Sequence, residues 1–217
     1  MKRIIALVAG LVFAVAAVAA ATPPDQMIRA TTDQLRTLID KNHDSYAKNN
    51  TQFYKVVDDL LVPHFDTKYI AQIILARNWR TATDDQRTRF QNAFKNMLID
   101  NYADELLENY NSVDVDYKPA RIDPDGTDST VDCQIVRKDG KPPINISFKL
   151  RLDGDQWEIF DVIVENISLV LNFRTQVASE IKRTSLDDVI SRMEKGELLK
   201  PVIDNKAAQP AAGGAAG

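Results

Sequence analysis

The chain has 217 residues, which is enough for one substantial domain and too few for a large multidomain protein. Apolar residues make up 44% of it, a share that suits an ordinary globular protein and excludes an integral membrane protein. Acidic residues outnumber basic ones by 31 to 27, which disfavours nucleic acid as a partner, because phosphate binding needs a basic surface.

The first 21 residues have the pattern of a secretory signal peptide. Lys2 and Arg3 form a short basic start, residues 4–21 are apolar apart from Gly10, and alanines at the end supply a small-residue cleavage site. A membrane anchor is the alternative, but the stretch is rich in alanine and no stop-transfer charge cluster follows it. We therefore expect cleavage and export. The mature chain would keep 25 basic and 31 acidic residues, a net charge of −6.

Helical spacing of apolar residues then predicts three helices. The first begins at residues 22–25, where prolines are tolerated in a first turn, and the second follows a polar break at residues 49–51. Pro63 ends the second helix, and Asp66 can cap a short third one. These helices form the N-terminal part of the predicted domain.

A longer helix is predicted after residue 83. Thr83-Asp84-Asp85-Gln86 has the form of a capping box, in which the first and last side chains bond each other's backbone N–H groups. Apolar residues then recur on one face for about seven turns and predict an amphipathic helix that ends near Asn111. They are Phe90, Phe94, Met97, Leu98, Tyr102, Leu106 and Tyr110.

From Val113 the apolar residues recur at every second position, which predicts four strands at 113–117, 130–137, 144–152 and 157–167. The turns between them, such as Asp153-Gly154, are too short for crossovers, so the strands form an antiparallel meander. Ile159 to Val164 is apolar on both faces except at Asp161, so we expect the fourth strand to be central and covered on both sides.

The chain returns to helix at Ser168, and Ser185 caps a last helix ended by Gly196. The predicted fold is therefore α+β: a four-stranded antiparallel meander sheet packed with N-terminal and C-terminal helices. We expect a single domain at 22–203 and a disordered tail rich in alanine and glycine at 204–217.

The sequence offers little for catalysis or metal binding. His43, His64 and the only cysteine, Cys133, are not paired at ligand spacing, and alternation places Cys133 among apolar neighbours as a buried structural thiol. Asp161 is the one carboxylate in an apolar strand. It is either a structural carboxylate that caps or pairs with a neighbour such as Arg174 or a general base in a pocket, and we favour the structural role.

Two motifs carry a resemblance to a known family. Trp79-Arg80-Thr81-Ala82-Thr83, followed by Gln86, Arg89-Phe90, Phe94 and Tyr102, resembles the MlaC (toluene-tolerance) family of periplasmic phospholipid carriers. So does Trp157-x-Ile159-x-Asp161-Val162, which leads into Ile167-Ser168-Leu169, Asn172-Phe173-Arg174 and Gln176. The resemblance covers about residues 25–200. Ala76 and Asn166 stand where the family usually has glycine, and Phe173 where it has tyrosine.

The resemblance implies a soluble periplasmic carrier that shuttles phospholipid between outer-membrane and inner-membrane Mla complexes. Such transport maintains outer-membrane lipid asymmetry and contributes to organic solvent tolerance. The implied partners are an inner-membrane ABC transporter with an MCE-domain subunit and an outer-membrane lipoprotein–porin complex. The chain is expected to be a monomer without a cofactor or metal, with phospholipid as its cargo. Since each CH₂ that leaves water contributes about 0.8 kcal/mol, a carrier must hide the acyl chains.

We expect the sheet and the helices to enclose an apolar cavity for these chains. The predicted acyl-chain contacts are Val56, Leu60, Ile70, Ile73, Ile74, Phe94, Leu98, Tyr102, Phe148, Leu150, Val162, Val164, Leu169 and Phe173. Apolar patterning alone does not separate a hollow core from a packed one. Two alternatives therefore remain: a periplasmic enzyme with an isomerase- or hydrolase-like pocket around Asp161, and an envelope adaptor with a solid core.

Overall fold

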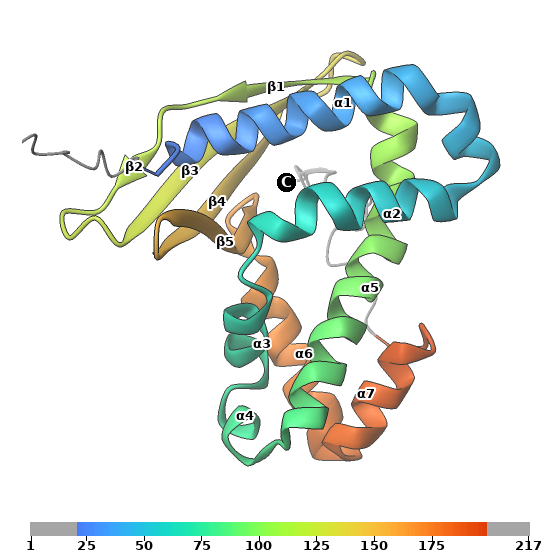
Figure 1. The fold of residues 1–217 in the computed structure, drawn as a ribbon, viewed down its shortest axis with the longest axis vertical. Coiled ribbons are helices and arrows are strands. Elements are labelled where there is room, and N and C mark those ends of the chain that lie inside the picture. Colours follow the sequence, from blue (N-terminus) through green and yellow to red (C-terminus); the bar gives the residue numbers. More distant parts are fainter. Residues whose placement is uncertain (1–20, 199–217) are drawn as a thin grey trace, which may run out of the picture.

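A computed structural model describes residues 21–198, so most of the predicted signal peptide, residues 199–203 and the predicted tail lie outside the described residues. Before the sheet come α1 (Pro24–Lys48), α2 (Asn50–Leu61), the 3-10 turn η1 (Val62–His64), α3 (Thr67–Leu75), α4 (Arg77–Thr81) and α5 (Asp84–Asn109) (Figure 1). The strands are β1 (Val113–Tyr117), β2 (Arg121–Ile122), β3 (Asp128–Arg137), β4 (Ile144–Asp153), β5 (Gln156–Val164) and β6 (Ile167–Ser168). They are followed by α6 (Leu169–Arg183) and α7 (Leu186–Glu194).

The predicted helix caps are confirmed. The Asp66 carboxylate accepts the N–H of Tyr69 at 2.7 Å and begins α3. At the start of α5, the Gln86 N–H donates to the Thr83 hydroxyl and the Thr83 N–H donates to the Gln86 side chain, so the capping box is complete. The short helix α4 was not predicted, because its five residues carry no apolar period.

The α+β class and the antiparallel meander are confirmed, with two additional short strands. The order across the sheet is β1-β3-β4-β5-β6, and β2 pairs with β3. The prediction that residues 157–167 form one central strand is wrong. The chain turns at Glu165 and Asn166, whose φ angles are positive, and Ile167 and Ser168 return as β6 beside the end of β5. β5 therefore has a full partner only in β4.

A β-bulge explains why β5 is apolar on both faces. Lys149 pairs with Asp161 but its neighbour Leu150 pairs with Ile159, so Phe160 is the extra residue. Ile159 and Val162 consequently share a face despite their odd spacing. Phe160 packs instead against the helices, with its ring edge-on to that of Tyr69 at 5.6 Å.

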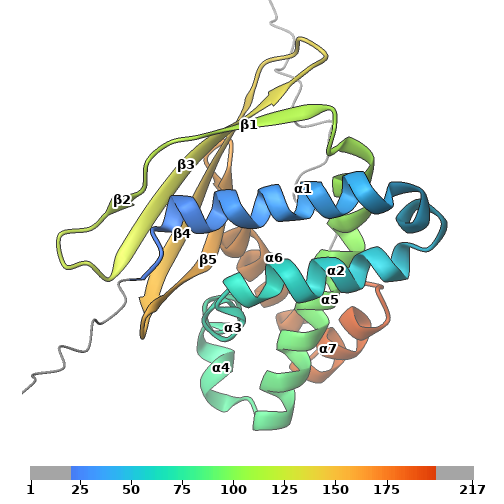
Figure 2. The same ribbon diagram turned by 45° about the horizontal axis from the view of Figure 1, so that its top comes forward.

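The core is divided into three clusters. A helical cluster joins α3, the first half of α5, α6 and α7, and it includes Phe90, Phe94, Phe173 and Ile190. A second cluster joins α1, α2 and the second half of α5. The third, the sheet cluster, packs Ile28 of α1 against Val131, Leu150, Trp157 and Ile159. Because Ile28 belongs to α1, the sheet cluster identifies the face of the sheet that α1 crosses (Figures 1 and 2).

Helix α5 does not bury one continuous face, contrary to the prediction. Its first half buries Phe90, Phe94 and Met97 in the helical cluster, whereas its second half buries Ile99, Ala103 and Leu107 in the cluster with α1 and α2. These two sets lie on nearly opposite sides of the helix, so each half of α5 packs against a different group of helices. Leu106, which the predicted face includes, is 41% exposed.

Two residues that replace glycines expected from the resemblance have positive φ angles. Ala76, between α3 and α4, has φ 48° and ψ −117°, and Asn166 in the β5–β6 turn has φ 66°. Asparagine tolerates the left-handed region because its side chain is short and polar, but alanine at this φ and ψ is strained. The departures in sequence therefore fall where the backbone favours glycine.

Candidate functional site

One face of the sheet is apolar across neighbouring strands. Ile135 pairs with Ile144, and Ile146 pairs with Cys133 on one side and with Val164 on the other. Residues paired directly in antiparallel strands point to the same side, so these side chains share a face. The same pairing connects this face to Val131 and Leu150 of the sheet cluster, and it is therefore the face that α1 crosses.

Part of this face is not covered by the three clusters. Ile135, Ile144 and Ile146 are only half-buried, and they belong to none of the three clusters. Beside them Phe148 and Val162 are half-buried at the border of the sheet cluster. Large apolar side chains in this state forfeit about 25 cal/mol for each Å² of apolar surface that stays in water. An apolar occupant would gain that free energy.

Helices α2 and α5 carry further half-buried apolar side chains, some of them at the edges of the helical cluster and of the cluster with α1 and α2. Val56 and Leu60 lie one turn apart on α2, and Leu98 and Tyr102 lie one turn apart on α5. Figures 1 and 2 both place α1 and α2 on the side of the sheet that carries the apolar face. We call the half-buried set the inner apolar surface: Ile135, Ile144, Ile146, Phe148 and Val162 on the sheet, and Val56, Leu60, Leu98 and Tyr102 on the helices.

The predicted acyl-chain contacts divide into two groups. The half-buried ones include Val56, Leu60, Leu98, Tyr102, Phe148 and Val162 of the inner apolar surface. Ile73 and Leu169 are half-buried too, and together with Leu98 they lie at the edge of the helical cluster. Val164 is buried beside Ile146. The others are fully packed among the protein's own side chains: Ile70, Ile74, Phe94 and Phe173 in the helical cluster and Leu150 in the sheet cluster. Their role as lipid contacts stays a prediction.

The prediction missed three sheet residues of this surface, Ile135, Ile144 and Ile146. The signal for them was present in the sequence. Alternation in the strand 144–152 puts Ile144 and Ile146 on the same side as Phe148 and Leu150, and the turn at Asp139-Gly140 brings Ile135 opposite Ile144.

Asp161 has a structural role at the start of α6. The Ser168 hydroxyl donates to one carboxylate oxygen at 2.5 Å, and the Val170 N–H donates to the other at 3.1 Å. The Ser168 oxygen in turn accepts the Leu171 N–H at 3.0 Å as the helix cap. Of the two structural roles expected for Asp161, capping is confirmed, and its partners are Ser168 and Val170 in place of the suggested Arg174. The structure thus favours the structural interpretation over a general base.

The other reactive side chains also have structural surroundings. Burial raises the pKa of the Cys133 thiol to about 11, which leaves it protonated and unreactive at neutral pH. The His64 Nε2 atom lies 3.0 Å from the Thr31 hydroxyl, and burial lowers the pKa of this imidazole. Among residues 21–198 no group of three or more potential ligands could hold a metal ion.

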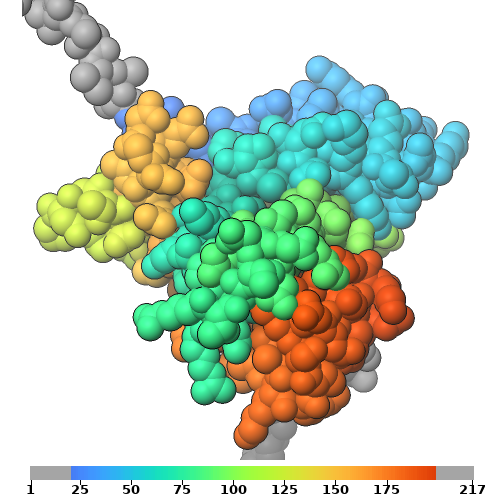
Figure 3. Space-filling model, turned by 60° about the horizontal axis from the view of Figure 1, so that its bottom comes forward, coloured from blue at the N-terminus to red at the C-terminus, as the bar shows by residue number. Residues whose placement is uncertain are grey.

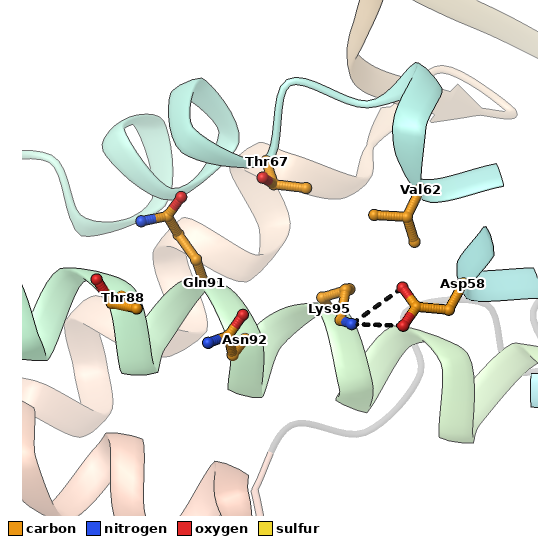
Figure 4. A pocket seen from close by; sticks show the side chains of 7 residues that line it. All are labelled: Asp58, Val62, Thr67, Thr88, Gln91, Asn92 and Lys95. Atoms are coloured by element: carbon orange, nitrogen blue, oxygen red, sulfur yellow. Dashed lines mark hydrogen bonds and ion pairs between the residues drawn. The ribbon is translucent and has the colours of Figure 1, made fainter. Parts of the chain in front are cut away.

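One pocket is lined mainly by polar side chains. It lies between α2, α3 and α5, has a volume of about 370 Å³ and contains the ion pair of Lys95 with Asp58, whose atoms are 2.8 Å apart (Figure 4). Its other lining residues are Val62, Thr67, Thr88, Gln91 and Asn92. None of the predicted acyl-chain contacts lines it, and its polar side chains do not suit a hydrocarbon chain. The inner apolar surface is therefore the better candidate for a lipid site.

Comparisons with known proteins agree with the motifs. The family model described as MlaC protein matches residues 29–195. A toluene tolerance protein, Ttg2D, of Pseudomonas putida is 32% identical over 176 residues, 81% of this chain and 80% of the relative. The intermembrane phospholipid transport system binding protein MlaC of Haemophilus influenzae is 20% identical over 189 residues, 86% of this chain and 87% of the relative.

A solved structure is similar as well. The phospholipid-binding protein of Ralstonia solanacearum, determined in complex with a phospholipid, superimposes with a TM-score of 0.72 and 25% identity. The match covers 81% of this chain and 97% of that one. Within the described part of this chain, none of the helices is long and apolar enough to cross a membrane. The motifs, the fold and the match across most of its length show that the chain belongs to the MlaC family.

Proposed function

We propose that this protein is a soluble periplasmic phospholipid carrier that moves lipid between inner-membrane and outer-membrane Mla complexes and so helps to maintain outer-membrane lipid asymmetry. The observation that carries the proposal is the inner apolar surface. Ile144 and Ile146 are half-buried on the sheet face that α1 crosses. The structurally similar protein of Ralstonia solanacearum was determined in complex with a phospholipid, which supports a lipid as the ligand of such a surface.

The chemistry of the chain supports binding without catalysis. Asp161 is engaged in capping α6, and burial keeps the Cys133 thiol protonated. A carrier has no bond to break. It has to shield two acyl chains from water, and it can leave the charged head group in solvent.

The proposed partners follow from the two membranes that such a carrier serves. On one side they are an inner-membrane ABC transporter with an MCE-domain subunit, and on the other an outer-membrane lipoprotein–porin complex. A mature net charge of −6 disfavours adsorption to anionic membranes, so handover by contact with these complexes is favoured over free collision with lipid surfaces. The carrier acts as a monomer in this scheme.

The test begins with protein purified from the periplasm without detergent and extracted with organic solvent. Mass spectrometry of the extract should show phospholipid in a near-stoichiometric amount. The same protein stripped of lipid should take up phospholipid from vesicles and regain its original lipid content. Protein that is lipid-free in repeated preparations and takes up none from vesicles would contradict the proposal and favour an adaptor.

A further inference from the structure

The polar pocket of Figure 4 and the inner apolar surface share one face of α5. Five side chains recur on this face at intervals of three and four residues, so they form a single stripe along the helix: Thr88, Gln91, Lys95, Leu98 and Tyr102. The first three line the pocket, and the last two belong to the inner apolar surface. Between Lys95 and Tyr102 the helix rises only about 10 Å. One phospholipid molecule can therefore reach both regions.

The opposite wall of the pocket comes from the segment that joins α2 to α3. Asp58 belongs to α2, Val62 to η1 and Thr67 to the first turn of α3. On α2, Asp58 and Leu60 point to opposite sides, because two residues turn a helix by about 200°. The pocket and the inner apolar surface are therefore continuous along α5 and not along α2. The volume of about 370 Å³ lies within the usual range for ligand pockets, about 300–1,000 Å³.

The polar groups of the pocket can bind a ligand that carries both charges. The Lys95 Nζ atom lies 2.9 and 2.8 Å from the two carboxylate oxygens of Asp58, and the two side chains are 24% and 38% exposed. Within residues 21–198, the Thr67 hydroxyl and the Asn92 amide have no hydrogen-bond partner in the protein. The pocket thus offers a cation, an anion and neutral hydrogen-bonding groups side by side.

We infer that this pocket binds a zwitterionic lipid head group with a phosphate and a primary ammonium group, as in phosphatidylethanolamine, while the acyl chains lie on the inner apolar surface. This inference rests on the proposed carrier function and adds the head-group site to it. The phosphate joins the glycerol backbone and stays nearer the acyl chains, so it meets Lys95, one helical turn from Leu98. The ammonium group lies beyond the phosphate and meets Asp58.

The head group replaces one ion pair by two. Each of its charges forms a charge-assisted hydrogen bond with one side chain of the Lys95–Asp58 pair. Opening this pair costs little, because partly exposed ion pairs contribute little to stability. The anionic head group of phosphatidylglycerol has no cation for Asp58, and the choline of phosphatidylcholine has no N–H to donate to it. The pocket should therefore prefer phosphatidylethanolamine to both.

A neighbouring ion pair supplies a matched control. The Lys55 Nζ atom lies 2.7 Å from a carboxylate oxygen of Asp59, and both residues belong to α2. Asp59 is adjacent to Asp58 in the sequence, but neither Asp59 nor Lys55 lines the pocket. Asp59→Asn therefore removes the same charge from the same helix without touching the proposed site.

The experiment equilibrates the lipid-free full chain with vesicles that contain equal amounts of phosphatidylethanolamine, phosphatidylglycerol and phosphatidylcholine. Mass spectrometry of an organic extract of the reisolated protein then gives the bound head groups. We expect the wild type to be enriched in phosphatidylethanolamine relative to the vesicles. Asp58→Asn should lower this enrichment by about three- to tenfold at an unchanged total lipid content, because the ammonium group loses its charged partner. Asp59→Asn should match the wild type.

An exchange of the two charges separates head-group binding from a purely structural ion pair. Asp58→Lys with Lys95→Asp keeps opposite charges on α2 and α5 but places the carboxylate where the phosphate would lie. This double variant should melt close to the wild type and lose the preference for phosphatidylethanolamine.

Three results would overturn the head-group site. One is a wild-type lipid composition equal to that of the vesicles, another is an unchanged enrichment in Asp58→Asn, and the third is an equal loss in Asp59→Asn. If the charge exchange does not fold, the comparison of Asp58→Asn with Asp59→Asn decides alone. The failure of the carrier function is a different result, since the wild type would then take up no lipid of any kind. Circular dichroism of every variant verifies that the fold is intact.

Discussion

The two ends of the molecule use similar side chains in different ways. In the helical cluster of α3, α5, α6 and α7, large side chains such as Phe90, Phe173 and Ile190 are at most 1% exposed. Figure 3 shows α5 and α7 side by side on the outer surface of this region. Between the sheet and α1–α2, comparable side chains such as Ile146 and Phe148 remain half-buried. The helical cluster is packed by the protein's own side chains, whereas the region between the sheet and α1–α2 is suited to an apolar ligand.

The largest effect is expected from a deletion in the helical cluster. Phe173→Ala removes a ring that is 1% exposed and packs edge-on to Phe94, so unfolding should become easier by about 3–5 kcal/mol. Chemical denaturation measures this loss. The phospholipid content of the folded fraction should stay unchanged. A loss of lipid with little loss of stability would place Phe173 in the lipid site and remove the contrast between the two regions.

Enlarged side chains separate the regions more sharply. Leu150 is fully buried in the sheet cluster, so Leu150→Trp should cost about 1–3 kcal/mol of stability. Ile146 lies on the same strand and the same face but is half-buried, so Ile146→Trp should leave the lipid-free protein nearly as stable as the wild type.

Lipid content is the second measurement on this pair. Ile146→Trp should bind clearly less phospholipid, because the indole takes up volume that an acyl chain would occupy. If Ile146→Trp instead retains full lipid and is as destabilised as Leu150→Trp, the inner apolar surface is ordinary core.

Asp161→Asn tests the enzyme alternative. The change keeps an acceptor for one of the two donors, Ser168 or Val170, and removes the charge, so the expected loss is about 1–2 kcal/mol. Lipid content and transfer should not change. Thermal unfolding alongside lipid quantification checks both points, and lipid loss without destabilisation would contradict the capping role.

A smaller gain is expected at the strained turn between α3 and α4. Ala76→Gly relieves a φ of 48° that alanine rarely adopts and should stabilise the protein by about 1 kcal/mol. Asn166→Gly is the matched control and should change stability much less, since asparagine tolerates its φ of 66°. Equal effects at both positions would mean that Ala76 is not strained.

The smallest effect concerns Cys133. Burial raises its pKa to about 11, above the ordinary thiol value of 9.0, so the unfolded chain releases this proton at a lower pH than the folded protein. The stability that depends on a protonated Cys133 thiol is therefore fully present below pH 9 and is lost as the pH rises from 9 towards 11. At pH 8, alkylation by iodoacetamide should be slow in native protein and fast in denaturant. Rapid alkylation of the native protein would show that the sheet face opens more readily than its burial indicates.

Much of the fold was predictable because its signals are local. The Thr83–Gln86 capping box and the Asp66 cap depend on neighbouring residues, and the alternation from Ile144 to Leu152 reports a half-covered strand directly. The bulge at Phe160 and the turn at Asn166 were missed. A one-residue insertion in pairing and an asparagine with positive φ leave no periodic trace.

The candidate site was only partly predictable for a different reason. Leu150 and Phe148 are two residues apart on one strand and face the same side, yet the first is fully buried and the second half-buried. Which of them is covered depends on where Ile28 of α1 comes to rest on the sheet. That position is set by tertiary packing and not by the pattern of either segment.

The most direct test of the contrast is to map the contacts of a bound lipid. Lipid-free protein is loaded with phosphatidylcholine that carries a diazirine near the middle of one acyl chain, irradiated and digested for mass spectrometry. The account predicts label in peptides of β4, β5, α2 and the second half of α5, around Ile146, Val162, Leu60 and Tyr102, and none in α7. Label concentrated in α7 and the first half of α5, with β4 unlabelled, would contradict it.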